Sequence, residues 1–145
     1  MQADELTGLS GKTILITGAG GMLGRAFIDS LANVGDVNVQ GRDHAQLDIT
    51  DRPSVLELAM LNPDIIIHCA ADVNAERCEA QPDQCRKVQV DGTQNIADLA
   101  VATGTQVLYP QSFLIFDGRE IPILENTKPA PMSVYGKCKY EAEQV

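Results

Sequence analysis

The sequence predicts an α/β fold in which a parallel sheet is covered by helices on both faces. Short apolar runs bounded by glycine or proline alternate along the chain with segments whose apolar residues recur at helical spacing. Strands that alternate with helices require crossover connections, which are right-handed in parallel sheets. The chain has 145 residues, 44% of them hydrophobic and 21% charged, which suits one globular domain with its own core.

The first expected element is a buried strand. Residues 12–17 form a β-branched apolar run, typical of a strand covered on both faces. Met22 to Val34 has helical spacing, and Gly35 is its predicted end. Residues 36–40 form a weaker strand. Asp51 and Pro53 begin a short helix that Pro63 ends, and residues 64–69 form the next strand. A longer helix is expected from about Pro82 to Thr103, ending at Gly104. A strand over residues 107–109 and a final helix capped by Ser133 follow.

Two segments are expected to be irregular. Residues 1–10 are interpreted as a disordered leader, so that residues 11–145 form the domain. The segment from Phe116 to Met132 carries three prolines and is the long loop of the chain. A loop of that length in a compact domain usually carries function or is mobile.

The charge and the cysteines exclude several classes of function. The net charge is −9 at pH 7, which argues against nucleic acid and anionic membranes as partners. No apolar run approaches the ~18 residues of a membrane span, and the N-terminus lacks the apolar core of a signal peptide. Cytoplasmic residence is therefore expected, with reduced thiols. The cysteine spacings match no zinc pattern and neither histidine lies at a useful offset, so no metal site is expected. The cysteines are Cys69, Cys78, Cys85 and Cys138.

A glycine-rich turn follows the first strand. Gly18, Gly21 and Gly24 are spaced by three residues, and Gly20 adds conformational freedom. Glycine lets the backbone turn sharply and approach a phosphate, and the following helix offers unpaired N–H groups to the anion. A glycine turn without a ligand is the alternative. Because a predicted strand precedes the turn and a predicted helix follows it, we interpret the turn as the dinucleotide-binding fingerprint of a Rossmann-like doubly wound sheet.

The end of the second strand bears on the choice between the nicotinamide cofactors. An acidic residue there accepts a hydrogen bond from the ribose 2′-hydroxyl, whereas an arginine pairs with a 2′-phosphate. Gly41 makes room at this position, and Arg42 is placed to meet a phosphate. NADP(H) is therefore favoured over NAD(H), with Asp43 as the feature that keeps NAD(H) open.

The final helix carries a pair of residues suited to proton transfer. Tyr135 and Lys139 are four residues apart and hence lie on one helix face. A free tyrosine has a pKa of about 10, and a nearby ammonium group favours the phenolate and lowers that pKa. The alternative is a surface helix that happens to carry an aromatic and a basic residue.

Taken together, these motifs resemble the extended short-chain dehydrogenase/reductase family, and within it the dTDP-4-dehydrorhamnose reductase branch. The resemblance covers nearly all of the chain from Lys12. The segments that carry it are residues 14–18, 21–25, 47–51, 68–71, 90–95, 116–118 and 131–137.

The resemblance implies a role for each matching residue. Ser112 would bind the substrate carbonyl, Tyr135 would be the general acid and Lys139 its partner. Asp48 and Ile49 would line the adenine. The implied cofactor-binding set is Gly18, Gly20, Gly21, Met22, Leu23, Gly24, Arg42, Asp48, Ile49, Cys69, Ala70, Ala71, Tyr135 and Lys139. The implied reaction is hydride transfer from NADPH to a keto carbon of a nucleotide-linked 4-keto-deoxysugar.

The chain also departs from the family pattern. The family usually reads Ser-Thr-Asp-Tyr where this chain has Gln111-Ser112-Phe113-Leu114, so two polar groups that would face substrate are apolar here. Gln89 stands where the family usually has asparagine.

The length is a further departure, because family members continue for roughly as many residues again. The fold is therefore expected to be truncated after the helix that carries Tyr135, without the substrate-binding part, and inactive as this chain. Its bare sheet edge would suit a second copy or a completing polypeptide.

Three functions stay open on these grounds. The first is an NADP(H)-dependent reductase of a nucleotide-linked 4-keto-deoxysugar. The second is a non-catalytic NADP(H)-binding regulatory subunit resembling that of methionine adenosyltransferase. The third is an inert Rossmann-like domain taken from a longer protein.

Overall fold

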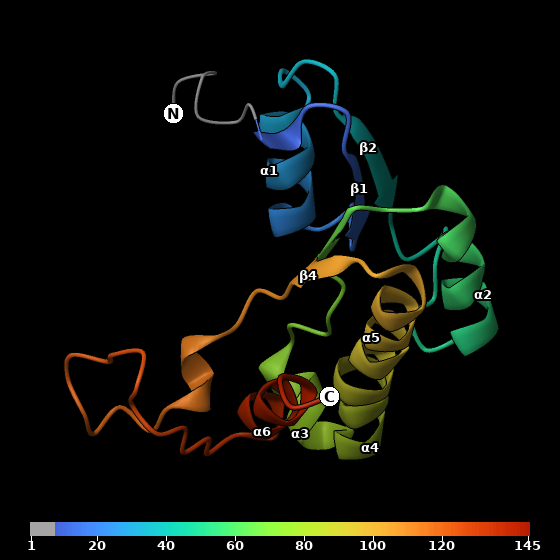
Figure 1. Ribbon diagram of the computed structural model, residues 1–145. Coiled ribbons are helices and arrows are strands. Elements are labelled where there is room, and N and C mark those ends of the chain that lie inside the picture. The colour runs from blue at the N-terminus through green and yellow to red at the C-terminus, as the bar shows by residue number, and fades with distance from the viewer. Residues whose placement is uncertain (1–7) are drawn as a thin grey trace. The chain divides into compact units, whose positions relative to one another are not determined.

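The computed structural model describes residues 8–145 and contains a four-stranded parallel sheet with strand order β2-β1-β3-β4 (Figure 1). The strands are β1 (Thr13–Thr17), β2 (Asn38–Arg42), β3 (Ile65–His68) and β4 (Gln106–Leu108). All three neighbouring pairs are parallel. The predicted α/β, Rossmann-like fold class is confirmed.

The central strand β1 is buried because its residues are apolar and it has a neighbour on each side. Ile14 pairs with Val39 of β2 and with Ile65 of β3. Ile14, Ile16, Leu31 and Ile67 form a buried cluster, against which apolar residues of helix α1 (Met22–Leu31) pack. Leu15 is fully buried and points to the opposite face of the sheet, because side chains alternate along a strand.

In this strand order, the connections from β1 and from β3 run to opposite sides of the sheet. The chain leaves β1 toward β2 on one side, and leaves β3 toward β4 on the other. In such sheets, ligands bind beyond the carboxyl ends of the strands at this switch point. The carboxyl ends of β1 and β3 are Thr17 and His68, which are paired in register.

The helices differ from the prediction in two places. Helix α1 ends at Leu31 rather than Val34, and the left-handed residue that follows is Asp36 (φ 59°) rather than the predicted Gly35. The helix predicted from Pro82 to Thr103 is three elements, and a further helix precedes it. These elements are α3 (Ala75–Ala80), α4 (Pro82–Arg86), a π-helical turn η3 (Lys87–Asp91) and α5 (Gly92–Thr103).

The other elements follow the prediction closely. The segment opened by Asp51 is α2 (Arg52–Glu57), continued by the 3-10 turn η2 (Leu58–Leu61). Gly104 ends α5 with a left-handed conformation (φ 68°). A 3-10 turn η4 (Phe113–Ile115) precedes the long loop, and α6 (Val134–Ala142) closes the chain.

The described residues form two compact units, and the single domain over residues 11–145 stays a prediction. The first unit, residues 8–70 and 95–110, contains the sheet and α1. The second unit, residues 71–94 and 111–145, contains α3, α4, η3, η4 and α6. The division arises because the chain leaves the sheet after β3 and β4, and the segments that follow pack on one another.

The predicted leader, residues 1–10, lies outside the described residues as far as residue 7. Its last part is folded, since Leu9 packs against the buried cluster and the Ser10 hydroxyl donates to Asp36 (3.1 Å). Among residues 8–145, no helix has both the length and the apolar character needed to cross a membrane.

Candidate functional site

Gly18 forms the turn at the carboxyl end of β1. Its backbone is left-handed (φ 67°), which L side chains rarely adopt. A Cβ at this position would lie 2.6 Å from the Ala70 nitrogen and 2.7 Å from the Cys69 carbonyl carbon. The backbones leaving β1 and β3 therefore approach so closely that only glycine fits. This close approach lies at the switch point of the sheet.

The N-terminus of α1 follows this turn. Gly21 is the N-cap residue, and no side chain caps the helix. A Cβ on Gly24 would overlap the Gly18 carbonyl oxygen, so the helix packs directly on the turn. Met22 is 90% exposed. The first N–H groups of α1 thus lack a side-chain acceptor, which is the arrangement that binds a phosphate anion at a helix N-terminus.

The end of β2 distinguishes Arg42 from Asp43. The Arg42 guanidinium donates to the Gly41 carbonyl (2.8 Å), and the Ala19 amide donates to the Arg42 carbonyl (3.0 Å). The Asp43 carboxylate instead accepts from the backbone amides of Ala45 (2.9 Å) and Gln46 (3.0 Å). Both residues lie beside the glycine turn, since a Cβ on Gly20 would lie 3.3 Å from the Asp43 Cβ, but the Asp43 carboxylate is held by hydrogen bonds within its own turn.

Gly41 packs closely against two neighbouring side chains. A Cβ there would lie 3.0 Å from the Ala19 Cβ and 3.1 Å from the Ile28 Cδ1. The absence of a side chain therefore lets β2 pack against the glycine turn and α1.

Asp48 and Ile49, which were expected to line the adenine, are held by a buried hydrogen bond from Asn95. Ile49 is buried (6% exposed), and its carbonyl accepts from the buried Asn95 side chain (2.9 Å). Asp48 is exposed, and its carboxylate accepts from the Thr50 amide (2.9 Å) and hydroxyl (2.8 Å). The Ile49 side chain belongs to the core, which leaves Asp48 as the exposed member of the pair.

Two buried residues at the strand ends were not predicted from the sequence. The Thr17 hydroxyl and the His68 Nδ1 lie 2.7 Å apart, and the Ala70 amide donates to the same hydroxyl (3.3 Å). The His68 ring stacks on Tyr109 with centroids 5.9 Å apart. These contacts hold the backbone of Cys69 and Ala70, which packs against Gly18. The one sequence feature that could have indicated these contacts is the position of His68 directly after the apolar run of residues 65–67.

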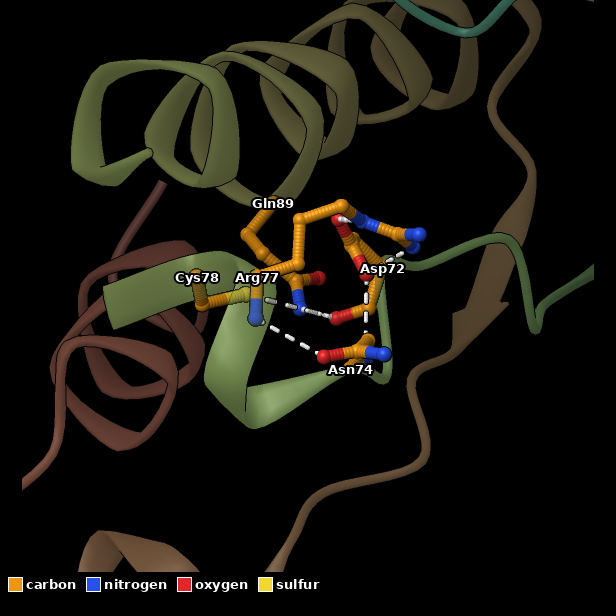
Figure 2. Close-up of polar contacts among 5 residues, drawn as sticks. All are labelled: Asp72, Asn74, Arg77, Cys78 and Gln89. Atoms are coloured by element: carbon orange, nitrogen blue, oxygen red, sulfur yellow. Dashed lines mark hydrogen bonds and ion pairs between the residues drawn. The ribbon is translucent and has the colours of Figure 1, made fainter. Parts of the chain in front are cut away.

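In the second unit, the segment after Ala71 is held by a polar cluster (Figure 2). Arg77 makes a two-bond ion pair with the Asp72 carboxylate (2.6 and 2.7 Å). Asn74 caps α3 by accepting from the Arg77 backbone amide (2.8 Å), and the Gln89 side-chain nitrogen Nε2 donates to the Asp72 carbonyl (2.8 Å). Hydrogen bonding from Arg77 holds the pKa of Asp72 below its usual value. The π-helical turn carries Gln89, which is 2% exposed.

The predicted proton-transfer residues meet on α6. Ser133 caps this helix as predicted, accepting from the Gly136 amide (3.0 Å). Tyr135 and Lys139 are both buried, 9% and 4% exposed. Hydrogen bonding from the Ser112 side chain acts to lower the pKa of the Tyr135 phenol. The second unit therefore places Ser112, which precedes η4, beside the helix that carries both Tyr135 and Lys139.

The expected lowering of the Tyr135 pKa does not occur in the described structure. Burial raises the pKa of this phenol above its usual value, and the Ser112 hydrogen bond opposes that effect. Helical spacing indicates the cation on the same helix face but not the burial of the phenol, which is the larger influence on its pKa.

Gly136 explains how η4 reaches α6. A Cβ on Gly136 would overlap the Leu114 carbonyl oxygen and would lie 3.2 Å from the Pro131 Cβ. Because the helix surface is bare at this point, the η4 backbone packs directly against it. This contact brings Ser112, the N-cap residue of η4, to Tyr135.

The departures from the family pattern have distinct surroundings. Phe113 is 75% exposed, whereas Leu114 is partly buried and its amide donates to the Ser112 hydroxyl (3.2 Å). Gln111 hydrogen-bonds the Ser112 amide and the Lys139 carbonyl. Phe113 is thus the apolar replacement that faces solvent.

The cysteines pack as apolar side chains. Cys78, Cys85 and Cys138 are buried in the second unit, and burial raises the pKa values of Cys85 and Cys138. Such thiols are poor nucleophiles. Within residues 8–145, no group of three or more His, Cys, Asp or Glu side chains is arranged to hold a metal ion.

The predicted site residues divide between the two units. The first unit contains the glycine turn, Arg42, Asp48, Cys69 and Ala70. The second contains the residues for which catalytic roles were expected, together with Ala71. The glycine turn fits a dinucleotide phosphate because a Cβ would fill the close approach and because no side chain caps α1.

Comparisons with known proteins agree with this geometry. The chain is 34% identical over 148 residues to methionine adenosyltransferase 2 subunit beta of Xenopus tropicalis, covering 97% of this chain and 44% of that protein. It is 33% identical to dTDP-4-dehydrorhamnose reductase of Aggregatibacter actinomycetemcomitans over 134 residues, 91% of this chain and 46% of that protein. The chain spans about half the length of the curated relatives it matches.

A solved structure gives the same result. The crystal structure of dTDP-4-dehydrorhamnose reductase from Bacillus anthracis in complex with NADP matches with a TM-score of 0.87 at 31% identity, covering 92% of this chain and 48% of that one. The family model described as the RmlD substrate binding domain matches residues 12–145. The chain therefore belongs to the RmlD substrate binding domain family.

Proposed function

We propose that the chain supplies the cofactor-binding and proton-donating residues of an NADP(H)-dependent reductase that acts on a nucleotide-linked 4-keto-deoxysugar. The observation that carries the proposal is the close packing of Leu114 on Gly136, which places Ser112 beside the helix of the buried Tyr135 and Lys139, in a chain that also has the glycine turn at Gly18. Family membership and the similarity to dTDP-4-dehydrorhamnose reductases support it.

The first unit would hold the cofactor. The pyrophosphate would lie against Gly18 and the N-terminus of α1, where N–H groups lack a side-chain cap. Arg42 would meet a ribose 2′-phosphate, since the competing Asp43 carboxylate accepts two backbone hydrogen bonds within its own turn. NADP(H) is therefore favoured over NAD(H). An Arg42→Gln variant is expected to weaken NADPH binding and leave NADH binding unchanged, and equal losses for both would contradict this role.

The second unit would supply the residues that protonate the carbonyl oxygen of the substrate. NADPH supplies the hydride that reaches the keto carbon, and the carbonyl oxygen then needs a proton. The Tyr135 Oη would donate it, and the raised pKa keeps this phenol protonated at neutral pH, as a general acid requires. Once substrate is bound, Ser112 would donate its hydroxyl hydrogen to the carbonyl oxygen in place of the Tyr135 phenol and so polarise the carbonyl. Lys139 is expected to support the resulting phenolate.

The test is an assay of the protein at its natural length with dTDP-4-dehydrorhamnose. The account expects substrate-dependent loss of NADPH absorbance, reduced at least ~100-fold by Tyr135→Phe because general acid catalysis is lost. A matched control is Tyr140→Phe, which changes a tyrosine on the same helix that has no proposed role. Full turnover by the Tyr135→Phe variant would contradict the proposal.

A second candidate is a non-catalytic NADP(H)-binding regulatory subunit resembling methionine adenosyltransferase 2 subunit beta. The 34% identity to that protein and the exposed Phe113, which replaces a polar group, favour it. This candidate expects NADPH binding without oxidation by any keto-sugar, and co-purification with a larger catalytic partner. Substrate-dependent NADPH oxidation that requires Tyr135 would reject it.

A further inference from the structure

Gln111 makes three side-chain hydrogen bonds that connect two elements of the second unit. Its carboxamide oxygen accepts from the Ser112 amide (2.9 Å). Its carboxamide nitrogen donates to the Lys139 carbonyl (3.3 Å) and to the Glu143 carboxylate. Glu143 is the C-cap residue of α6. One side chain therefore joins the backbone of Ser112 to the C-terminal half of the helix that carries Tyr135.

The Ser112 hydroxyl takes part in two hydrogen bonds, one with the Leu114 amide and one with the Tyr135 phenol. It accepts from the Leu114 amide (3.2 Å), and the Ser112 side chain also hydrogen-bonds the Tyr135 phenol. A hydroxyl has a single hydrogen to donate, so the amide of Leu114 occupies an acceptor position and leaves that hydrogen for Tyr135. The direction of the hydroxyl depends on where the Ser112 backbone lies.

The two ends of this segment are held by different means. After Ser112, the Leu114 carbonyl packs on the bare surface of Gly136. Before Ser112, the carboxamide of Gln111 makes the connection to α6. The family usually has serine at this position, and a serine side chain is too short to span from the Ser112 amide to Lys139 and Glu143. The connection therefore belongs to the glutamine that this chain has.

We propose that Gln111 is a positioning residue that holds the Ser112 hydroxyl on the Tyr135 phenol by joining the Ser112 backbone to the end of α6. Its catalytic consequence rests on the proposed reductase function, but the positioning itself does not. Without Gln111, the Ser112 amide loses its acceptor and the segment is held at its Leu114 end alone.

The test is a spectrophotometric titration of the tyrosines in the chain without cofactor. The chain has three tyrosines and no tryptophan, so subtracting the curve of Tyr135→Phe isolates the Tyr135 phenol. Ser112→Ala is expected to raise the pKa of Tyr135, since the Ser112 hydrogen bond lowers it. Gln111→Ala is expected to raise it in the same direction, and the double variant is expected to add nothing to Ser112→Ala.

Two further variants separate positioning from general destabilisation. Gln111→Glu keeps an acceptor for the Ser112 amide but loses both donations to α6, so it is expected to behave as Gln111→Ala and serves in its place if that variant fails to fold. Gln84→Ala removes an exposed glutamine from α4 and is expected to leave the titration unchanged. Circular dichroism over the titrated range confirms that each variant stays folded.

The outcomes are decisive for the proposal. An unchanged Tyr135 titration in both Gln111 variants would overturn it, as would effects of Gln111→Ala and Ser112→Ala that add in full. In the natural-length protein, Gln111→Ala is expected to lower kcat about tenfold, equivalent to about 1.4 kcal/mol, with the KM for NADPH unchanged. A shifted titration without turnover in any variant would support positioning and reject the reductase function.

Discussion

Replacing Gly18 by alanine tests the turn at the switch point of the sheet. Two costs add at this position. The left-handed backbone (φ 67°) costs an L-residue roughly 1–2 kcal/mol. The added methyl group would lie 2.6–2.8 Å from backbone atoms of Cys69 and Ala70, which cannot rotate away, and such overpacking costs roughly 1–3 kcal/mol. Alanine also loses less backbone entropy on folding, which offsets about 0.4–1 kcal/mol. The expected loss is about 3 kcal/mol.

Two matched substitutions separate these costs. Gly11→Ala carries the same left-handed strain (φ 73°) with no atom within 4 Å, and Gly35→Ala carries neither cost. Urea unfolding followed by circular dichroism is expected to rank the losses Gly18→Ala, then Gly11→Ala, then Gly35→Ala, with the last near zero. A melting temperature lowered by about 6–12 °C is the corresponding thermal result for Gly18→Ala. If Gly18→Ala and Gly11→Ala destabilised the chain equally, the close approach of the two backbones would be refuted.

Three other changes have definite expected outcomes. Gly136→Ala places a methyl group 3.1 Å from the Leu114 carbonyl carbon, so it is expected to destabilise the chain by roughly 1–3 kcal/mol and to alter the Tyr135 phenol titration, and a silent titration would contradict the packing of η4 on α6. Gly24→Ala would overlap the Gly18 carbonyl oxygen and is expected to abolish NADPH binding measured by fluorescence, whereas retained affinity would argue against the glycine turn as the phosphate site. The pKa of Asp72 is lower in the folded chain than in the unfolded one, so its pairing with Arg77 stabilises the fold above about pH 4 and is lost as the pH falls further. Asp72→Asn is therefore expected to flatten the acid limb of the stability profile, and an unchanged limb would show that the pair contributes nothing.

The fold class and the glycine turn were predictable because they depend on local signals. The apolar β-branched run of β1 and the glycines after it specify a buried strand and a close backbone approach without knowledge of their partners. The cap of α6 was predictable for the same reason, since Ser133 satisfies the first N–H groups of the helix by itself.

The features that were missed depend on contacts between distant residues. Helix α1 ends at Leu31, and Asp36, rather than Gly35, takes the left-handed conformation and accepts from the distant Gly11 amide (2.6 Å). The long helix is interrupted by a π-helical turn that carries the buried Gln89, whose side-chain carboxamide donates to the Asp72 carbonyl. The raised pKa of Tyr135 follows from burial, which a helical spacing does not reveal.

The most direct test of the account is a calorimetric titration of the chain with NADPH and then with NADH. The account predicts NADPH binding with a Kd of about 1 μM, corresponding to about −8 kcal/mol, and weaker binding of NADH because only NADPH carries the phosphate that Arg42 would meet. Absence of binding for both cofactors would contradict the claim that the glycine turn at Gly18 and the uncapped α1 form a nucleotide site.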